Sequence, residues 1–155
     1  MENTGNNPII NWQMRNKYDA VPFSLIKTEH FLPAIEHGLN EAKKNIDAIA
    51  ESKEEPTFEN VILAMEFAGE VLDRASNIYF NLFGSESDND MKALAQEISP
   101  KLAQFGNYVM MNEKLFNKVK VLHDKIEELN LNSEQKRLLE KNYIGFERNG
   151  ALLDE

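Results

Sequence analysis

The sequence predicts an all-α protein, an antiparallel bundle of about five amphipathic helices with an irregular N-terminal arm. Three observations carry this prediction. Apolar residues recur at steps of three and four along most of the 155 residues, which is the spacing of one helix face. The seven Gly and five Pro residues lie mostly between these periodic segments. No stretch alternates apolar and polar residues as a half-buried strand does. Short connections between helices favour antiparallel neighbours.

The length suits one globular domain, so we expect a single helical domain over residues 1–155, with the arm at 1–27 and helices over 28–155. Pro8, Pro22 and several Asn residues favour an extended backbone in the arm. Three aromatic residues are expected to fix the arm to the helices: Trp12, Tyr18 and Phe23.

The first helix is expected over residues 28–52. Thr28 is its predicted N-cap, and Pro33 falls early enough in the helix to be tolerated. Its apolar stripe consists of Phe31, Ile35, Leu39, Ala42, Ile46 and Ile49.

The second helix is expected to begin after Thr57, its predicted N-cap, and to run without a break to Gly84. Its main apolar stripe contains Phe58, Ile62, Met65, Ala68, Leu72, Ala75, Tyr79 and Leu82. A second apolar line widens the predicted buried face: Leu63, Phe67, Val71 and Ile78. We therefore expect this helix to be central and packed on more than one side.

Three shorter patterns follow. The third helix includes Pro100, which predicts a kink or a split near Ser99 because proline removes a donor and clashes one turn back. Asn112 is the predicted N-cap of the fourth helix, Ser133 caps the fifth, and Gly150 closes it. The apolar positions are Met91, Leu94, Ile98, Leu102, Phe105 and Val109, then Leu115, Val119, Leu122, Ile126 and Leu129, then Leu139, Tyr143 and Phe146.

The amino-acid composition argues against several classes of partner and of chemical site. Lys and Arg total 17 against 26 Asp and Glu, a net charge of −9, which argues against nucleic acid or an anionic membrane as a partner. The absence of Cys removes disulfides, thiolate metal sites and Cys nucleophiles. No apolar run approaches the ~20 residues of a membrane helix, and the first ten residues do not resemble a signal peptide. We expect a cytoplasmic protein, or a periplasmic one if a native signal peptide was removed.

Catalytic motifs are missing from the sequence. It contains no glycine-rich phosphate loop, no Gly-x-Ser-x-Gly elbow and no His-Glu-x-x-His pair. His30, His37 and Glu41 could share one helix face, but the two histidines are two turns, about 10 Å, apart along the axis, with Pro33 between them. We therefore assign no catalytic, cofactor-binding or metal-binding residue in this chain. His123 has no evident partner.

Three further groups of residues have a structural and a functional interpretation. The aromatic residues Phe58, Phe67, Tyr79, Phe80 and Phe83 are expected in the core, and a groove lined by them is the alternative. Two carboxylate pairs are expected to be solvated: Glu54 with Glu55, and Glu127 with Glu128. The same holds for a lysine-rich face: Lys114, Lys118, Lys120 and Lys125.

Several segments, in order, carry a resemblance to a known family. They include Pro22-Phe23, His30 to Gly38, Pro56 to Asn60, Phe80-Asn81-Leu82, Ser99 to Leu102, Leu115-Phe116, and Arg137 to Glu140 with Tyr143 and Phe146. Together they resemble the N-terminal region of the thimet-oligopeptidase family of zinc metallopeptidases, in its peptidyl-dipeptidase and oligopeptidase A branches. The resemblance covers nearly the whole chain.

The resemblance implies that this chain is an N-terminal fragment, because proteins of the family are several times longer and carry their zinc motif beyond the matched region. It implies a non-catalytic helical segment that walls or lids the peptide channel. The parent enzyme would use zinc to hydrolyse short peptides, releasing C-terminal dipeptides. Its partners would be the missing C-terminal catalytic part and short peptides, with no nucleic acid or membrane. A stand-alone helical protein-interaction module is the alternative.

Overall fold

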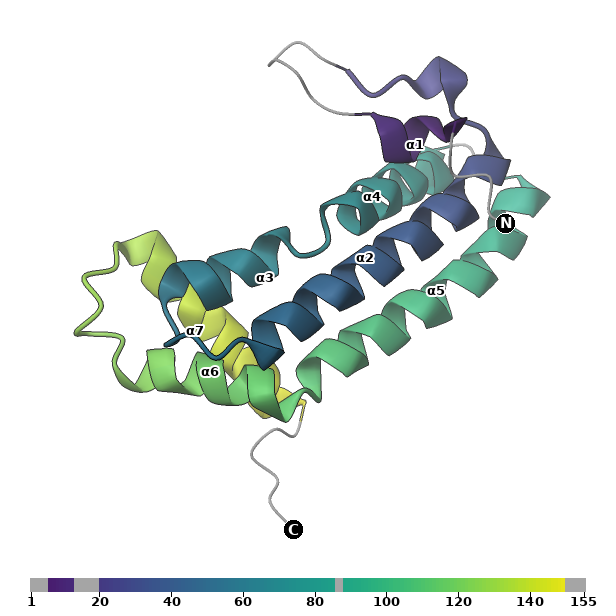
Figure 1. Cartoon of the computed structure of the whole chain (residues 1–155). Helices are drawn as coiled ribbons and strands as arrows, with labels where there is room; N and C mark the ends of the chain where they lie inside the picture. Colours follow the sequence, from purple (N-terminus) through teal and green to yellow (C-terminus); the bar gives the residue numbers. More distant parts are fainter. Residues whose placement is uncertain (1–5, 13–19, 86–87, 150–155) are drawn as a thin grey trace. The chain divides into compact units, whose positions relative to one another are not determined.

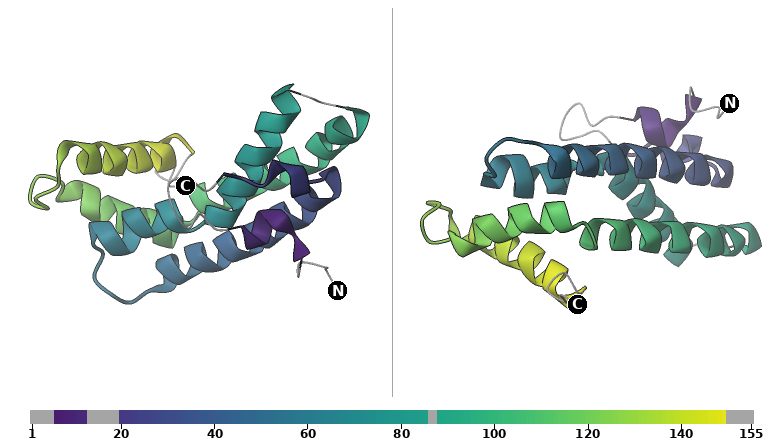
Figure 2. Two further views of the ribbon diagram at one scale, coloured as in Figure 1. Left: turned by 90° about the horizontal axis from the view of Figure 1, so that it is seen from above. Right: turned by 60° about the horizontal axis from the view of Figure 1, so that its bottom comes forward.

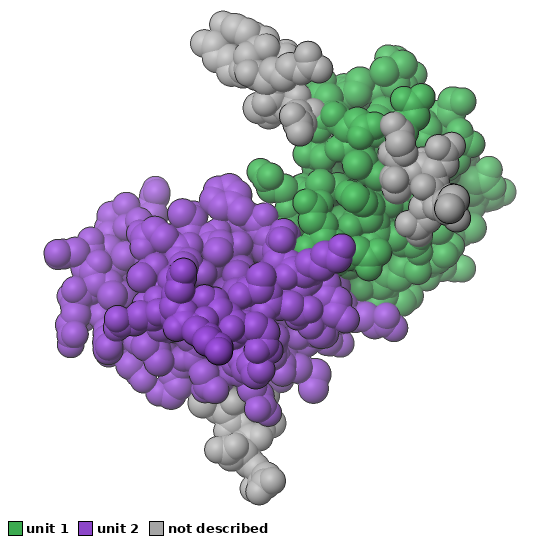
Figure 3. Space-filling view, in the orientation of Figure 1, with its two compact units in different colours: residues 1–42, 69–102 green, residues 43–68, 103–155 purple. Residues whose placement is uncertain are grey.

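The computed structural model describes residues 6–12, 20–85 and 88–149, which are mostly helical and contain no strand. The prediction of an all-α helical protein is therefore confirmed. The chain divides into two compact units (Figure 3): unit 1 is Met1–Ala42 with Gly69–Leu102, and unit 2 is Lys43–Ala68 with Ala103–Glu155. The expectation of one domain stays a prediction, and each unit is described by itself.

Five long helices account for most of the structure, and short helical turns lie between them (Figure 1). In chain order the elements are α1 (Pro8–Asn11), η2 (Phe23–Leu25), η3 (Thr28–His30), α2 (Phe31–Glu51), η4 (Phe58–Leu63), α3 (Ala64–Phe67), α4 (Glu70–Ser85), α5 (Asn89–Met110), α6 (Glu113–Asp124) and α7 (Ser133–Arg148). In unit 2, α6 and α7 form an antiparallel pair joined by a short loop (Figure 2).

The N-terminal arm contains a helical turn where an extended chain was expected. The Asn7 Oδ1 accepts a hydrogen bond from the Ile9 amide at 2.9 Å, and Pro8 occupies the first helical position. The Asn7 Nδ2 also donates to the His30 carbonyl at 2.7 Å. Ile9 is completely buried, and α1 packs against α4. A local cap thus overrides the extended preference of this Asn- and Pro-rich segment.

The arm is held by contacts that differ from the expected ones. Arg74 of α4 donates from Nε to the Ile9 carbonyl at 3.1 Å and from Nη2 to the Ile10 carbonyl at 3.3 Å. Its guanidinium lies 5.8 Å from the centre of the Trp12 ring, a cation–π contact. Trp12 therefore anchors the arm as predicted, whereas Phe23 is 52% exposed and does not. Tyr18 lies outside the described residues.

In unit 1, α2 and α4 approach each other closely at a glycine. A Cβ added to Gly38 would lie 2.6 Å from the backbone nitrogen of Leu72 and 2.7 Å from its Cα. Leu72 is buried, as its place in the apolar stripe predicts. Because the obstacle is backbone, no side-chain rotation can relieve the contact, and only glycine permits this spacing.

Gly38→Ala is therefore expected to destabilise the protein by about 2 kcal/mol, since overpacking outweighs the gain in helix propensity. Urea unfolding followed by circular dichroism measures the change. Gly106→Ala is the matched control: nothing lies within 4 Å of a Cβ placed there, and we expect it to stabilise α5 by up to about 1 kcal/mol. Equal effects of the two substitutions would contradict the close approach of α2 and α4.

Tyr79 ties α4 to the start of α5. Its ring is fully buried and packs edge-on against Phe31, with 5.3 Å between the ring centres. Its hydroxyl donates to the Met91 carbonyl at 2.6 Å. Burial raises the pKa of this phenol.

We expect Tyr79→Phe to lower the free energy of unfolding by about 1–2 kcal/mol, because a buried carbonyl loses its hydroxyl donor while the ring packing is kept. Chemical denaturation of the two proteins at neutral pH measures this loss. A loss near zero would show that the hydrogen bond to Met91 contributes nothing to stability.

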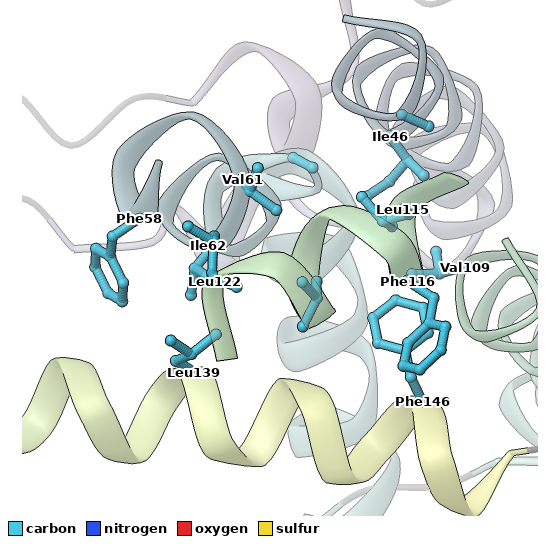
Figure 4. Packing of buried hydrophobic residues seen from close by; sticks show 13 residues of the cluster. Ile46, Phe58, Val61, Ile62, Val109, Leu115, Phe116, Leu122, Leu139 and Phe146 are labelled. Atoms are coloured by element: carbon cyan, nitrogen blue, oxygen red, sulfur yellow. The ribbon is translucent and has the colours of Figure 1, made fainter. Parts of the chain in front are cut away.

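The core of unit 2 is formed by side chains from α2, η4, the end of α5, α6 and α7 (Figure 4). The rings of Phe116 and Phe146 lie 5.7 Å apart, and the ring of Tyr143 lies 5.9 Å from that of Phe116. The residues labelled in the figure are Ile46, Phe58, Val61, Ile62, Val109, Leu115, Phe116, Leu122, Leu139 and Phe146. Most of them belong to the predicted apolar stripes.

The predicted second helix is not continuous. It consists of a six-residue π-helix, η4, followed by α3 and, after a turn at Ala68-Gly69, by α4. The Ala68 amide bonds the Met65 carbonyl at 3.2 Å, and the Ala68 carbonyl accepts from Asn45 Nδ2 at 2.9 Å. A side chain of α2 thus takes part in ending α3, which a periodicity argument cannot foresee.

The second apolar line of that helix is only partly buried. Ile78 is buried as expected, but Leu63 is 38% exposed and Phe67 is 60% exposed. A π-helix has more residues per turn than an α-helix, so the 3.6-residue spacing does not hold through η4. The predicted broad buried face is therefore wrong at these two positions.

Of the kink or split predicted near Ser99, the split does not occur, because α5 runs through Ser99 and Pro100 without interruption, and the kink stays a prediction. Pro100 and Gln96 both lie on the exposed side of the helix. The carbonyl of Gln96, which loses its usual donor to the proline ring, can therefore be hydrated.

Two of the four predicted N-caps, Thr57 and Asn112, are confirmed. The Thr57 hydroxyl accepts from the Asn60 amide at 3.1 Å, and Asn112 Oδ1 accepts from the Leu115 amide at 3.0 Å. The cap of α7 is Asn132, one residue before the predicted Ser133. Thr28 is not a cap either, since it opens the turn η3. Gly150 lies outside the described residues.

Candidate functional site

The three residues considered for a metal site do not come together. His30 Nδ1 accepts a hydrogen bond from the Lys27 amide at 3.0 Å, so this ring caps the turn before α2. His37 Nε2 faces Glu41 Oε2 at 3.8 Å on the surface of α2. Among the described residues, no three His, Asp or Glu side chains form a group that could hold a metal ion.

His123 has a partner that the sequence did not reveal. Its ring lies parallel to the ring of Tyr143, with 3.8 Å between the centres and 5° between the planes. The pair joins α6 to α7 in unit 2. Burial, with a smaller contribution from Glu147, raises the pKa of Tyr143. The two residues are 20 positions apart in the sequence, so no local spacing could have indicated the contact.

The predicted aromatic cluster is divided between the two units. In unit 1, Tyr79 packs against Phe80 and Phe83, with ring centres 5.1 and 6.0 Å apart. Phe58 belongs to the core of unit 2, and Phe67 also lies in unit 2. The core interpretation is confirmed for Phe58 and Tyr79, whereas Phe67 and Phe80 are exposed.

Three lysines of α6 make polar contacts at the surface of unit 2. Lys114 Nζ lies 2.6 Å from Glu51 Oε1, Lys118 donates to the Ser52 carbonyl at 2.7 Å, and Lys120 pairs with Asp124. Part of the predicted lysine-rich face therefore contacts neighbouring residues instead of being fully solvated.

The expectation of solvated carboxylate pairs is confirmed, because all four residues are exposed: Glu54, Glu55, Glu127 and Glu128.

A second polar contact links α2 to α5 within unit 2. The Tyr108 hydroxyl donates to Asp47 Oδ1, and Lys43 Nζ lies 4.6 Å from the centre of the Tyr108 ring. The hydrogen bond to Asp47 raises the pKa of Tyr108. Tyr108 and Asp47 are both half-buried, and their contact joins α2 to α5.

Two apolar side chains of η4 and α3 in unit 2, Leu63 and Phe67, are exposed to solvent, and we call them the apolar strip. Phe67 is the most exposed aromatic side chain among the residues that the structure describes. The same helical segment sends Phe58, Val61 and Ile62 into the core. One side of η4 and α3 is therefore packed in the core, while Leu63 and Phe67 lie on the exposed side.

The segment that carries the apolar strip is held at both ends. Thr57 and Asn60 form a reciprocal capping box, with the Thr57 amide donating to Asn60 Oδ1 at 2.7 Å. Asn45 bonds the Ala68 carbonyl at the other end, and α6 and α7 pack against η4. These contacts fix the strip in place, and the sequence gives no signal for them beyond the Thr57 cap.

No helix in the described part of the chain has the length and apolar character needed to cross a membrane.

No family model matches the sequence. The chain is 33% identical over 136 residues to dipeptidyl carboxypeptidase of Escherichia coli, which covers 88% of this chain and 20% of that protein. It is 30% identical over 149 residues to dipeptidyl carboxypeptidase of Salmonella typhimurium, covering 96% of this chain and 22% of that protein.

This chain is a relative of the thimet-oligopeptidase family of metallopeptidases. Oligopeptidase A of Escherichia coli is also similar, at 24% identity over 133 residues. The chain spans about a fifth of the length of these relatives. The predicted resemblance to the N-terminal region of such peptidases is confirmed.

Proposed function

We propose that this chain is the non-catalytic N-terminal helical segment of a zinc-dependent peptidase that hydrolyses short peptides and releases C-terminal dipeptides. The observation that carries the proposal is the similarity over most of this chain to peptidases of which it spans only about a fifth. Two of those relatives are named dipeptidyl carboxypeptidases. The catalytic residues would then lie in the remaining polypeptide. A cytoplasmic location stays a prediction.

The described residues of this chain do not fit a zinc site. His37 with Glu41 offers two ligands at most, and the rings of His30 and His123 are engaged with Lys27 and Tyr143. Structural zinc sites have four protein ligands and catalytic ones three. We therefore place the zinc ligands of the proposed enzyme outside this segment.

The role proposed for the segment is to wall or lid the peptide channel. Two features support it. The helices are fixed by side-chain caps and by the glycine-mediated contact of α2 with α4, which gives rigid walls. Large apolar side chains remain exposed in each unit, Phe80 in unit 1 and Phe67 in unit 2. A wall of this kind contributes to catalysis by excluding water and bulky substrates rather than by chemistry.

The test compares the full-length protein with the 155-residue chain on an N-terminally blocked tetrapeptide, with mass spectrometry of the products. We expect the full-length protein to release a C-terminal dipeptide, to lose this activity to a chelator and to regain it with zinc. It should leave a folded protein with the same C-terminal sequence intact. The 155-residue chain should cleave neither substrate at the same molar concentration.

Chelator-sensitive cleavage by the 155-residue chain would contradict the non-catalytic role. Efficient digestion of the folded protein by the full-length enzyme would contradict the channel role. If the natural protein cleaves no peptide and the chain is monodisperse by itself, the stand-alone interaction module is favoured.

A further inference from the structure

The Asn149 side chain caps a main-chain carbonyl at the C-terminal end of α7. Its Nδ2 donates to the Gly145 carbonyl at 2.8 Å. The main-chain nitrogen of Asn149 donates to the Phe146 carbonyl at 3.1 Å, so it does not serve the Gly145 carbonyl, whose usual partner is the amide four residues on. The side-chain amide therefore takes the place of that donor, at the negative end of the helix dipole.

Asn149 is followed by Gly150 in the only Asn-Gly pair of the sequence. The main-chain nitrogen of the next residue can attack the side-chain amide of an asparagine, and the attack is least hindered when that residue is glycine, which has no Cβ. Asn149 is exposed, so water reaches its amide. It also lies at a helix end, where local opening costs little free energy.

We propose that Asn149 is a site of spontaneous deamidation, a modification that removes the cap at the end of α7. The Gly150 nitrogen forms a bond to the Asn149 Cγ, the bond from Cγ to Nδ2 breaks, and the Gly150 amide proton leaves with that nitrogen as ammonia. Water then opens the succinimide ring. Opening at Cγ gives aspartate, and opening at the main-chain carbonyl carbon gives isoaspartate, whose main chain is one carbon longer.

Both products lose the hydrogen bond to the Gly145 carbonyl. The new carboxylate has no proton to donate at neutral pH, and its negative charge lies at the negative end of α7. Phe146, the next residue, is fully buried in the core of unit 2 and packs against Phe116. The last turn of α7 is therefore expected to open more often after the reaction. Because ammonia is lost, the change accumulates with the age of the molecule.

Asn142 is a matched control in the same helix. Its Nδ2 donates to the Leu138 carbonyl at 3.0 Å, four residues back, as that of Asn149 does to Gly145. It is followed by Tyr143 and lies in the interior of α7. The two amides thus make the same hydrogen bond and differ in the following residue and in their distance from the helix end.

The test incubates the full-length protein in neutral buffer for several weeks and follows both amides by mass spectrometry of proteolytic peptides. Chromatography separates the aspartate and isoaspartate products. We expect Asn149 to react several-fold faster than Asn142, and Gly150→Ala to slow the reaction at Asn149 several-fold. In Asn149→Asp, which stands for one of the products, hydrogen exchange in the last turn of α7 should rise several-fold.

A synthetic peptide of residues 145–153 is the positive control, since it deamidates under the same conditions. If the Asn149 amide is retained in the protein after the peptide has reacted, the proposal is overturned. Equal rates at Asn149 and Asn142, or an unchanged rate in Gly150→Ala, would also overturn it. Unchanged hydrogen exchange in Asn149→Asp would reject the loss of the cap. None of these readouts depends on peptidase activity, so the result is independent of the proposed function.

Discussion

Phe146→Ala is expected to lower the free energy of unfolding by about 3–5 kcal/mol, the usual cost of removing a fully buried aromatic ring. Phe146 has no exposed surface and packs against Phe116, with 5.7 Å between the ring centres. It lies in α7, where Leu139 is the other buried residue. Removing the Phe146 ring would leave a cavity between α6 and α7, and these two helices cannot easily move together to fill it. Urea unfolding monitored by circular dichroism measures the change.

Ile144→Ala is the matched control for Phe146→Ala, since Ile144 lies two residues away on α7 but is 42% exposed. We expect this control to cost less than about 1 kcal/mol. If Phe146→Ala costs no more than its control, then α7 does not pack against the core of unit 2 as described.

Leu72→Ala is expected to destabilise unit 1 by about 2–5 kcal/mol. Leu72 is 5% exposed, and its backbone lies against Gly38 of α2. The contact between the two helices is so close that α4 has little freedom to move inward and fill the cavity. The same unfolding measurement applies, with hydrogen exchange of α2 and α4 amides to localise the effect to this unit.

Asn77→Ala, on the exposed side of α4, is the control for Leu72→Ala. We expect an effect within about 0.5 kcal/mol, as for surface substitutions in general. A loss below about 1 kcal/mol for Leu72→Ala itself would mean that the side chain is not core, and the contact of α2 with α4 would need revision.

Local signals predicted the caps Thr57 and Asn112 and the buried face of α2. Thr57 and Asn112 were recognised as caps because each precedes an apolar run and has a side chain that can bond the amide three residues on. The stripe through Ile35, Ala42 and Ile46 predicted the buried face of α2 because the helix is regular there. Such features depend only on neighbouring residues.

Features that depend on distant residues were missed. Arg74 reaches Ile9, 65 positions earlier in the chain, and Asn45 reaches Ala68, 23 positions later. Neither partner could be inferred from spacing. The exposure of Leu63 and Phe67 was missed because the prediction assumed α-helical periodicity through a segment that is π-helical.

The family was predicted through resemblance, whereas the sequence predicted no site residue. The ordered motifs indicated the peptidase family that the comparisons confirm, and the non-catalytic role, which rests on the absence of His-Glu-x-x-His, stays a prediction. The stacking of His123 on Tyr143 and the apolar strip required the structure, because both depend on how helices meet or turn.

The reading frame of the natural gene beyond the codon for Glu155 tests most directly whether this chain is a segment of a longer zinc peptidase. We expect an open frame that continues for several times the length of this chain and encodes a His-Glu-x-x-His motif. A stop codon directly after Glu155 would contradict it and would leave a stand-alone helical protein.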